Sequence, residues 1–127
     1  MLPLILLPDM IRRDCGFGPG VSIPNDARAM QITLGITHMM ERESLDVAVW
    51  GSSDDAGWGA KPLVHFPQKS YCGTYSLLLD LTSSRAIRSL RVEYKLNRWG
   101  ADNLTPLFSF YVRASIPVSA AAAGARA

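Results

Sequence analysis

Few side chains in this sequence could support acid–base, redox or metal chemistry. The chain has two histidines, His38 and His65, and two cysteines, Cys15 and Cys72. These residues lie far apart and form no CxxC unit, whereas zinc sites use closely spaced ligand pairs. We therefore expect no metal and no cofactor. The alternative is a calcium ion beneath the loop at 51–59, although Ca²⁺ takes about six oxygen ligands and few acidic residues are near.

Catalytic motifs are also missing from the sequence. No serine lies in a GxSxG nucleophile elbow, and no glycine-rich loop leads into a helix as a phosphate site requires. Carboxylates occur close together at Asp54 and Asp55 and at Glu41 and Glu43, in segments that are typical of turns. We therefore expect a protein that is not an enzyme. The enzyme alternative would need a site formed by His65, Asp54 and Asp55.

Tryptophan, arginine and asparagine in the segments between apolar runs are better candidates for binding. Trp58 closes the stretch 51-GSSDDAGWG-59, and Trp99 lies in 97-NRWGADN-103. A flat indole beside hydrogen-bonding groups suits a sugar ring or a partner's side chain. The rings would stack while the polar groups fix the orientation of the ligand. The expected contact set is Asp54, Trp58, Asn97, Arg98 and Trp99. Alternatively, the tryptophans fill the ends of the core and Arg98 covers one of them.

Size and composition indicate a single globular domain. A chain of 127 residues can bury a core without disulfide or metal staples. Its 48% hydrophobic and 19% charged residues are an ordinary globular balance. The net charge is +2 and the basic residues are scattered, which argues against a nucleic-acid partner. No segment approaches the roughly 20 apolar residues of a membrane span, so no span is expected.

The first 14 residues, 1-MLPLILLPDMIRRD-14, combine an apolar run with basic residues, as secretory signals do. Here the positive charge follows the run instead of preceding it, and the run is short. We expect no cleaved signal, and instead a strand that Pro8 and Asp9 end. Cys15 and Cys72 are expected to be independent buried thiols, with a disulfide between them as the alternative in an exported protein.

Alternation of apolar and polar residues with a period of two predicts the strands. It is seen in 30–39, 45–51, 74–81 and 89–96, whereas 106–114 is apolar on both faces and is expected to be covered. In the first of these segments His38 falls on the apolar face with Met30, Ile32 and Leu34, so we expect a histidine in or beside the core. The charged residues 41–44 form a connection short enough for a hairpin.

These strands predict the fold class. No segment carries a helical stripe, and at most one helical turn is expected at 82–89. Short strands separated by Gly, Pro, Asn and Asp clusters are typical of an antiparallel β-sandwich or jelly roll. We expect one such domain over residues 1–118, with a Gly/Pro-rich connection at 15–28. The Ala-rich tail at 119–127 is expected to be flexible.

The stretch Gly51 to Trp58 resembles the G-S-x-D-G-x-x-W segment of discoidin-type (coagulation-factor C-type) β-sandwich domains, and 88-RSLRVEYKL-96 resembles their arginine-bearing strand. The resemblance covers residues 45–113 and implies a sandwich in which Trp58 anchors the turn. The chain departs from the family in having Asp55 where glycine is usual, in its shorter length and in lacking the pair of terminal cysteines.

The same pattern of turns and strands is similar to small β-sandwich proteins that decorate or cement tailed-phage capsids. Two functions are therefore expected. The first is a non-catalytic interaction module that binds a glycan or a protein surface through its end loops. The alternative is a structural assembly protein, such as a capsid-decorating or oligomeric shell subunit. It would form a homo-oligomer through the strand at 2–7 and the connection at 15–28.

Overall fold

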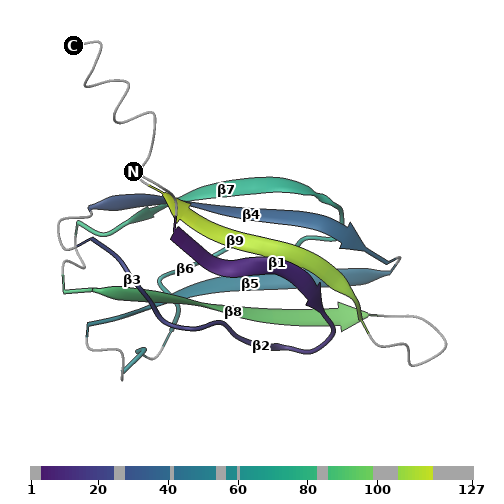
Figure 1. The fold of residues 1–127 in the computed structure, drawn as a ribbon, viewed down its shortest axis with the longest axis horizontal. Coiled ribbons are helices and arrows are strands. Elements are labelled where there is room, and N and C mark those ends of the chain that lie inside the picture. Colours follow the sequence, from purple (N-terminus) through teal and green to yellow (C-terminus); the bar gives the residue numbers. More distant parts are fainter. Residues whose placement is uncertain are drawn as a thin grey trace, which may run out of the picture.

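The computed structural model describes residues 4–24, 28–40, 42–53, 57–59, 61–82, 86–98 and 106–115. Regular structure in these residues consists of strands alone (Figure 1). The strands are β1 (Leu4–Arg12), β2 (Gly16–Phe17), β3 (Val21–Ser22), β4 (Ala29–Met39), β5 (Glu43–Ser52), β6 (Val64–His65), β7 (Gly73–Asp80), β8 (Ser89–Arg98) and β9 (Phe108–Ser115). In the same part of the chain, no helix is long and apolar enough to cross a membrane.

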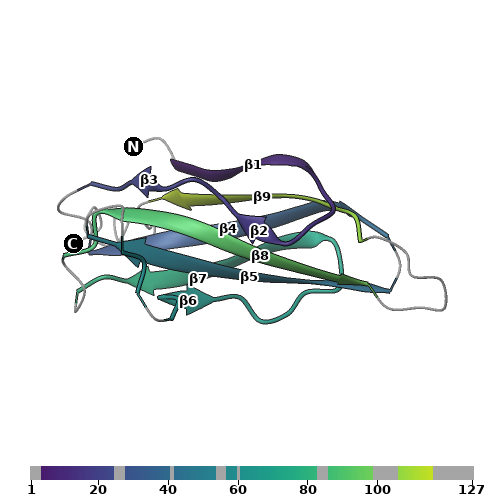
Figure 2. The same cartoon turned by 90° about the horizontal axis from the view of Figure 1, so that it is seen from below.

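The strands form two antiparallel sheets that pack face to face (Figures 1 and 2). The first sheet has the order β1-β9-β4-β7, and the second has the order β2-β8-β5-β6 with β3 also paired to β8. The predicted antiparallel β-sandwich is therefore confirmed. The alternating apolar residues of β4, β5, β8 and β9 fill the space between the sheets, where Phe108 and Phe110 are the largest fully buried side chains.

The predicted hairpin at 41–44 is wrong, because β4 belongs to the first sheet and β5 to the second. The connection instead carries the chain from one sheet to the other. Glu43 is fully buried there, and its carboxylate accepts hydrogen bonds from the backbone N–H groups of Met40 at 2.7 Å and Leu107 at 2.9 Å. Glu43 thus satisfies two backbone donors at the crossing between the two sheets. Because its carboxylate has these partners, Glu43 is buried and does not lie in an exposed turn.

The first strand does not end at Pro8 and Asp9 as expected. β1 runs on to Arg12 and pairs with β9 on both sides of Pro8 and Asp9, with register shifts between Ile5 and Leu7 and between Leu7 and Met10. Pro8 is tolerated at this irregular point because β1 is an edge strand, so one side of its backbone has no ladder to lose. A proline that interrupts the ladder need not end the strand.

The expectation that His38 joins the core is also wrong. The pairing of β4 with β9 shifts register between Ile36 and His38, which is a β-bulge. A bulge inserts one extra residue and reverses the alternation beyond it. Thr37 and His38 are consequently both exposed, while Met39 packs against the core.

The described part of the connection at 15–28 pairs with the second sheet. Its residues supply β2 and β3, which both pair with β8, and Ile23 is buried in the core. Cys15 and Cys72 are free, but both are exposed, so the expectation of buried thiols is wrong. Cys15 lies at the sheet edge, where its Sγ accepts a hydrogen bond from the backbone N–H of Leu96 at 3.4 Å. The expected tail at 119–127 lies outside the described residues.

Candidate functional site

The outer face of the second sheet carries a set of polar and aromatic side chains. Residues paired across antiparallel strands point to the same face. Three such rows cross the outer face: Arg91–Trp50, Glu93–Ala48–His65 and Lys95–Asp46. Ala48 is the small residue in the middle row, so the sheet has a low point between the longer side chains of Glu93 and His65.

Trp50 forms one wall of this low point. It is half-buried, and its indole Nε1–H donates a hydrogen bond to Glu93 Oε1 at 3.1 Å. A hydrogen bond to a carboxylate is stronger than one between neutral groups. The indole is therefore held in one orientation on the sheet, with the Glu93 carboxylate beside it.

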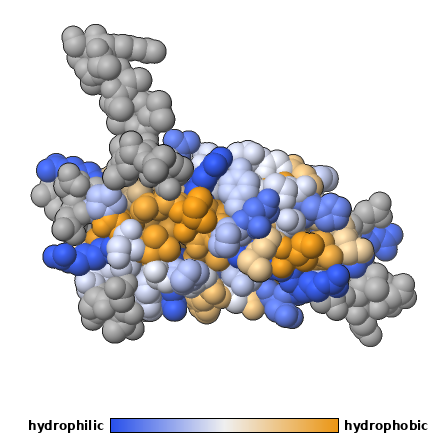
Figure 3. Space-filling model, in the orientation of Figure 1, coloured by the Kyte–Doolittle hydropathy of each residue, from blue (hydrophilic) through white to orange (hydrophobic). Residues whose placement is uncertain are grey.

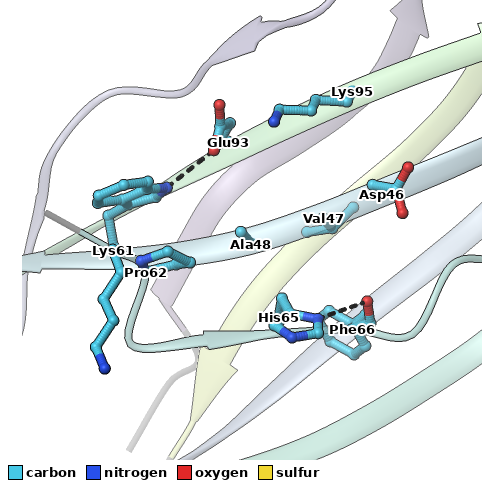
Figure 4. A pocket seen from close by; sticks show the side chains of 10 residues that line it. Asp46, Val47, Ala48, Lys61, Pro62, His65, Phe66, Glu93 and Lys95 are labelled. Carbon is cyan, nitrogen blue, oxygen red and sulfur yellow. Dashed lines mark hydrogen bonds between the residues drawn. The ribbon is translucent and has the colours of Figure 1, made fainter.

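Residues 61–66 close the opposite wall. The strand β6 pairs with β5 at Val64 and His65, and Lys61 and Pro62 precede it. Together with Trp50 and the rows of Ala48 and Asp46 they line a hollow of about 500 Å³, in which Ala48 lies between Glu93 on one strand and His65 on another (Figure 4). Nδ1 of His65 lies 3.4 Å from the backbone carbonyl oxygen of Phe66.

The rim of this hollow alternates in charge. Asp46 and Glu93 are acidic, whereas Lys61 and Lys95 are basic. Gln68 extends the polar rim, since its Nε2 donates to Asp46 Oδ2 at 3.2 Å. The hollow thus combines an apolar wall with several donors and acceptors. Such a set can bind hydroxyl groups without a net charge requirement.

A second feature lies beside it, at the end of the sheet where β5 finishes. The guanidinium carbon of Arg91 is 4.3 Å from the centroid of the Phe17 ring and 4.6 Å from that of Trp58. A second hollow of about 390 Å³ opens here, lined by Trp58, Arg91 and the segment from Gly18 to Ser22. Arg91 pairs with Trp50 across the strands, so the two hollows adjoin on one face.

The structure does not bring the expected contact set together. Trp58 lies against Arg91, whereas Asn97 and Arg98 end β8 at the other end of the sandwich. Arg91 and Arg98 are seven positions apart on one strand, which is roughly 23 Å at about 3.3 Å per residue. Asn97 is exposed and Arg98 is half-buried, with its Nη1 3.5 Å from Met40 Sδ. Asp54 and Trp99 lie outside the described residues, as does Asp55 of the enzyme alternative.

Sequence reasoning missed Trp50, Arg91, Glu93 and Phe17. By alternation Trp50 falls on the outward side of 45–51, and Arg91 and Glu93 are among the outward residues of 89–96. The sequence signal for a site was the small residue Ala48 between these outward-facing positions. It indicates a hollow only when the register of β5, β6 and β8 is known, because that register places Ala48 between Glu93 and His65.

Within the described ranges no three His, Cys, Asp or Glu side chains gather as a metal site. Comparison with known proteins finds no matching family model, no matching curated protein and no matching solved structure.

Proposed function

We propose that this protein is a non-catalytic β-sandwich module that binds a carbohydrate on the outer face of its second sheet. The observation that carries the proposal is the Trp50 indole, fixed by Glu93 beside the hollow over Ala48. A sugar ring has an apolar face that stacks on an aromatic ring and a rim of hydroxyl groups that need both donors and acceptors. The Trp50 wall and the mixed rim of Asp46, Lys61 and Lys95 supply both.

The shape of the site supports a chain-like ligand. Small-molecule pockets bury most of their ligand inside a concave, mostly apolar cavity. Here the hollow lies across the strands on the face of a sheet, and the second hollow continues it toward Trp58. An oligosaccharide could occupy both. Of the contact set expected from the sequence, the proposal retains Trp58. It replaces the other members with residues of the sheet face, such as Trp50 and Glu93.

The resemblance of residues 51–58 to the discoidin-type turn agrees with a sandwich that acts by binding. The expected contact through end loops did not distinguish a glycan from a protein surface. The mixed-charge rim favours the glycan, because the core of a protein interface is usually depleted in charged residues. If the experiment below finds no saccharide ligand, the glycan is rejected and a protein surface is the remaining alternative.

Binding to an array of oligosaccharides, followed by calorimetry with the best ligand, tests the proposal. Trp50→Ala should weaken binding by roughly tenfold or more, since stacking on an aromatic ring and the bonds beside it contribute about 1–3 kcal/mol. Trp50→Phe keeps a ring but removes the donor to Glu93, and should lose less. Leu78→Ala is the control, because Leu78 is exposed on the first sheet. Unchanged affinity in Trp50→Ala, or no saccharide ligand, would reject the proposal.

A second candidate function is assembly through β1. This strand lies at the edge of the first sheet, and Ile5, Met10 and Ile11 are 54%, 52% and 60% exposed. Figure 3 shows hydrophobic surface along the side of the molecule on which β1 lies. An edge strand with apolar side chains is a natural template for pairing with another chain. This observation supports the shell-subunit alternative as the second candidate.

The solution mass distinguishes the two candidates. An assembly protein should sediment as an oligomer that Ile5→Lys and Ile11→Lys together convert to a 13.9 kDa monomer. Leu78→Lys on β7, the opposite edge of the same sheet, is the matched control and should leave the oligomer intact. A wild-type chain that is monomeric at high concentration would reject assembly.

A further inference from the structure

Arg91 is a cation on the outer face of the second sheet, opposite Trp50 on the neighbouring strand. Its guanidinium packs against the rings of Phe17 and Trp58 at 4.3 and 4.6 Å. Its Nε is buried and has no hydrogen-bond partner in the part of the chain that the structure describes. A buried donor without a partner is rare in folded proteins and indicates a functional or strained position. The ring contacts are made by the faces of the guanidinium. Its N–H groups lie in the guanidinium plane, so these contacts do not occupy them.

The hollow beside Arg91 has a wall that the fold holds in place. The backbone N–H of Gly18 donates to Val92 O at 2.7 Å, and that of Ile23 donates to Arg88 O at 2.9 Å. Between these two bonds, Val21 and Ser22 pair with β8. A side chain at Gly18 would meet Leu7 at 2.5 Å, so the segment lies close against β1. The hollow is therefore preformed, and its volume is about 390 Å³.

The charge of this hollow differs from that of its neighbour. Its described lining consists of Gly18, Pro19, Gly20, Ser22, Trp58 and Arg91, in which Arg91 is the charged side chain. The larger hollow over Ala48 contains both acidic and basic groups. A planar carboxylate is the group that best matches a guanidinium fork. The aromatic rings fix that fork in advance, which lowers the entropy lost on binding.

We infer that Arg91, held by Phe17 and Trp58, is a subsite for the carboxylate of an acidic sugar, so that the ligand is a uronate-containing glycan. This inference rests on the proposed function, because it places the acidic unit of the same ligand next to the ring that stacks on Trp50. Trp50 is the direct cross-strand partner of Arg91, and neighbouring strands are about 4.8 Å apart. One oligosaccharide therefore reaches both residues.

The test compares a galacturonate oligomer with its methyl ester, which has the same rings but no charge. Calorimetry should give tighter binding of the acid by roughly tenfold or more, in line with hydrogen bonds to charged groups. Arg91→Gln should abolish this preference while leaving affinity for the ester. Arg113→Gln is the matched control, since Arg113 also packs on a ring, 4.9 Å from the centroid of Tyr111, but on the first sheet. The preference should survive in this variant.

Two outcomes overturn the inference, and they are distinguishable from failure of the proposed function. Equal binding of acid and ester, or a preference that survives in Arg91→Gln, removes the carboxylate subsite and leaves a neutral-glycan module. If no oligomer binds, the proposed function fails and the subsite is tested with free glucuronate. A shift of the Trp58 indole resonance that Arg91→Gln abolishes would retain the anion site, and no shift would reject it.

Discussion

Glu43 and Leu107 lie 64 positions apart in the chain, and the carboxylate Oε1 of the first accepts a hydrogen bond from the backbone N–H of the second at 2.9 Å. The other oxygen, Oε2, accepts from the N–H of Met40 at 2.7 Å. A single buried carboxylate therefore connects the crossing from β4 to β5 with the residues that enter β9.

Removing this carboxylate should destabilise the sandwich. Glu43→Ala leaves two backbone donors without partners, and each unsatisfied buried donor costs about 1–3 kcal/mol. We expect a loss of about 2–5 kcal/mol in the free energy of unfolding, measured by urea denaturation. Asp46→Ala on the same strand removes a half-buried carboxylate of the outer face, and should change stability by less than about 1 kcal/mol. Equal effects of the two substitutions would contradict this role.

Gly35 and Tyr111 face each other across β4 and β9. A Cβ at Gly35 would overlap the ring of Tyr111, so the absence of a side chain lets this ring lie across the neighbouring strand. Gly35→Ala should cost about 1–3 kcal/mol by overpacking. In a Tyr111→Ala background the same substitution should cost much less, and a double-mutant cycle in thermal unfolding measures the difference. Additive effects would show that the two residues are not coupled.

Asp80 provides a pH-dependent contact at the end of β7. Its Oδ1 accepts hydrogen bonds from the backbone N–H of Thr82 at 2.9 Å and from the Thr82 hydroxyl at 2.7 Å. These bonds, the backbone one first, lower the pKa of Asp80 below the ordinary 3.8. Because the folded pKa is lowered, the contact stabilises the fold fully above the ordinary pKa and is lost as pH falls through the lowered value.

Thr82→Val tests this contact, since it keeps the shape and the backbone donor but removes the hydroxyl. The pKa of Asp80, followed by NMR of its carboxyl carbon, should rise part of the way toward its ordinary value. Asp80→Asn should remove the associated loss of stability in acid. A pKa that does not move in Thr82→Val would mean that the hydroxyl has no part in holding the charge.

The two cysteines offer a direct check of the edges of the fold. Cys15 and Cys72 are free and exposed, so both should react with a thiol reagent in the native protein. Cys15→Ser and Cys72→Ser should each lower the thiol count by one equivalent. Reaction that follows only the rate of global unfolding would contradict the exposed positions of both residues.

The alternation of side chains was sufficient to predict the sandwich, because a half-buried strand must show a period of two on whichever sheet it lies. It was not sufficient to assign strands to sheets. Residues 41–44 read as a hairpin because they are short and charged, and nothing local reveals that Glu43 satisfies donors on a segment 64 positions away. His38 was misplaced for a related reason, since the bulge after Ile36 depends on β9 and leaves no mark in β4 itself.

The candidate site shares one residue with the contact set expected from the sequence. Trp58 was identified from its loop, and the structure places it on Arg91. Asn97 and Arg98 seemed to belong with it because both segments connect strands, but connections at opposite ends of a sandwich cannot meet. The row of Glu93, Ala48 and His65 comes from three segments whose register is set by pairing. Such a row is a property of the folded sheet and is not visible along the chain.

The pairing of β1 with β9 has a consequence for how the protein is made. β9 lies between β1 and β4 in the first sheet, so until residues 108–115 have left the ribosome β1 has no partner strand and β4 has β7 alone. Folds dominated by such non-local pairings form slowly, on the order of milliseconds to seconds. We expect nascent chains that stop before β9 to remain sensitive to protease, and protection to arise in one step once synthesis has passed this strand.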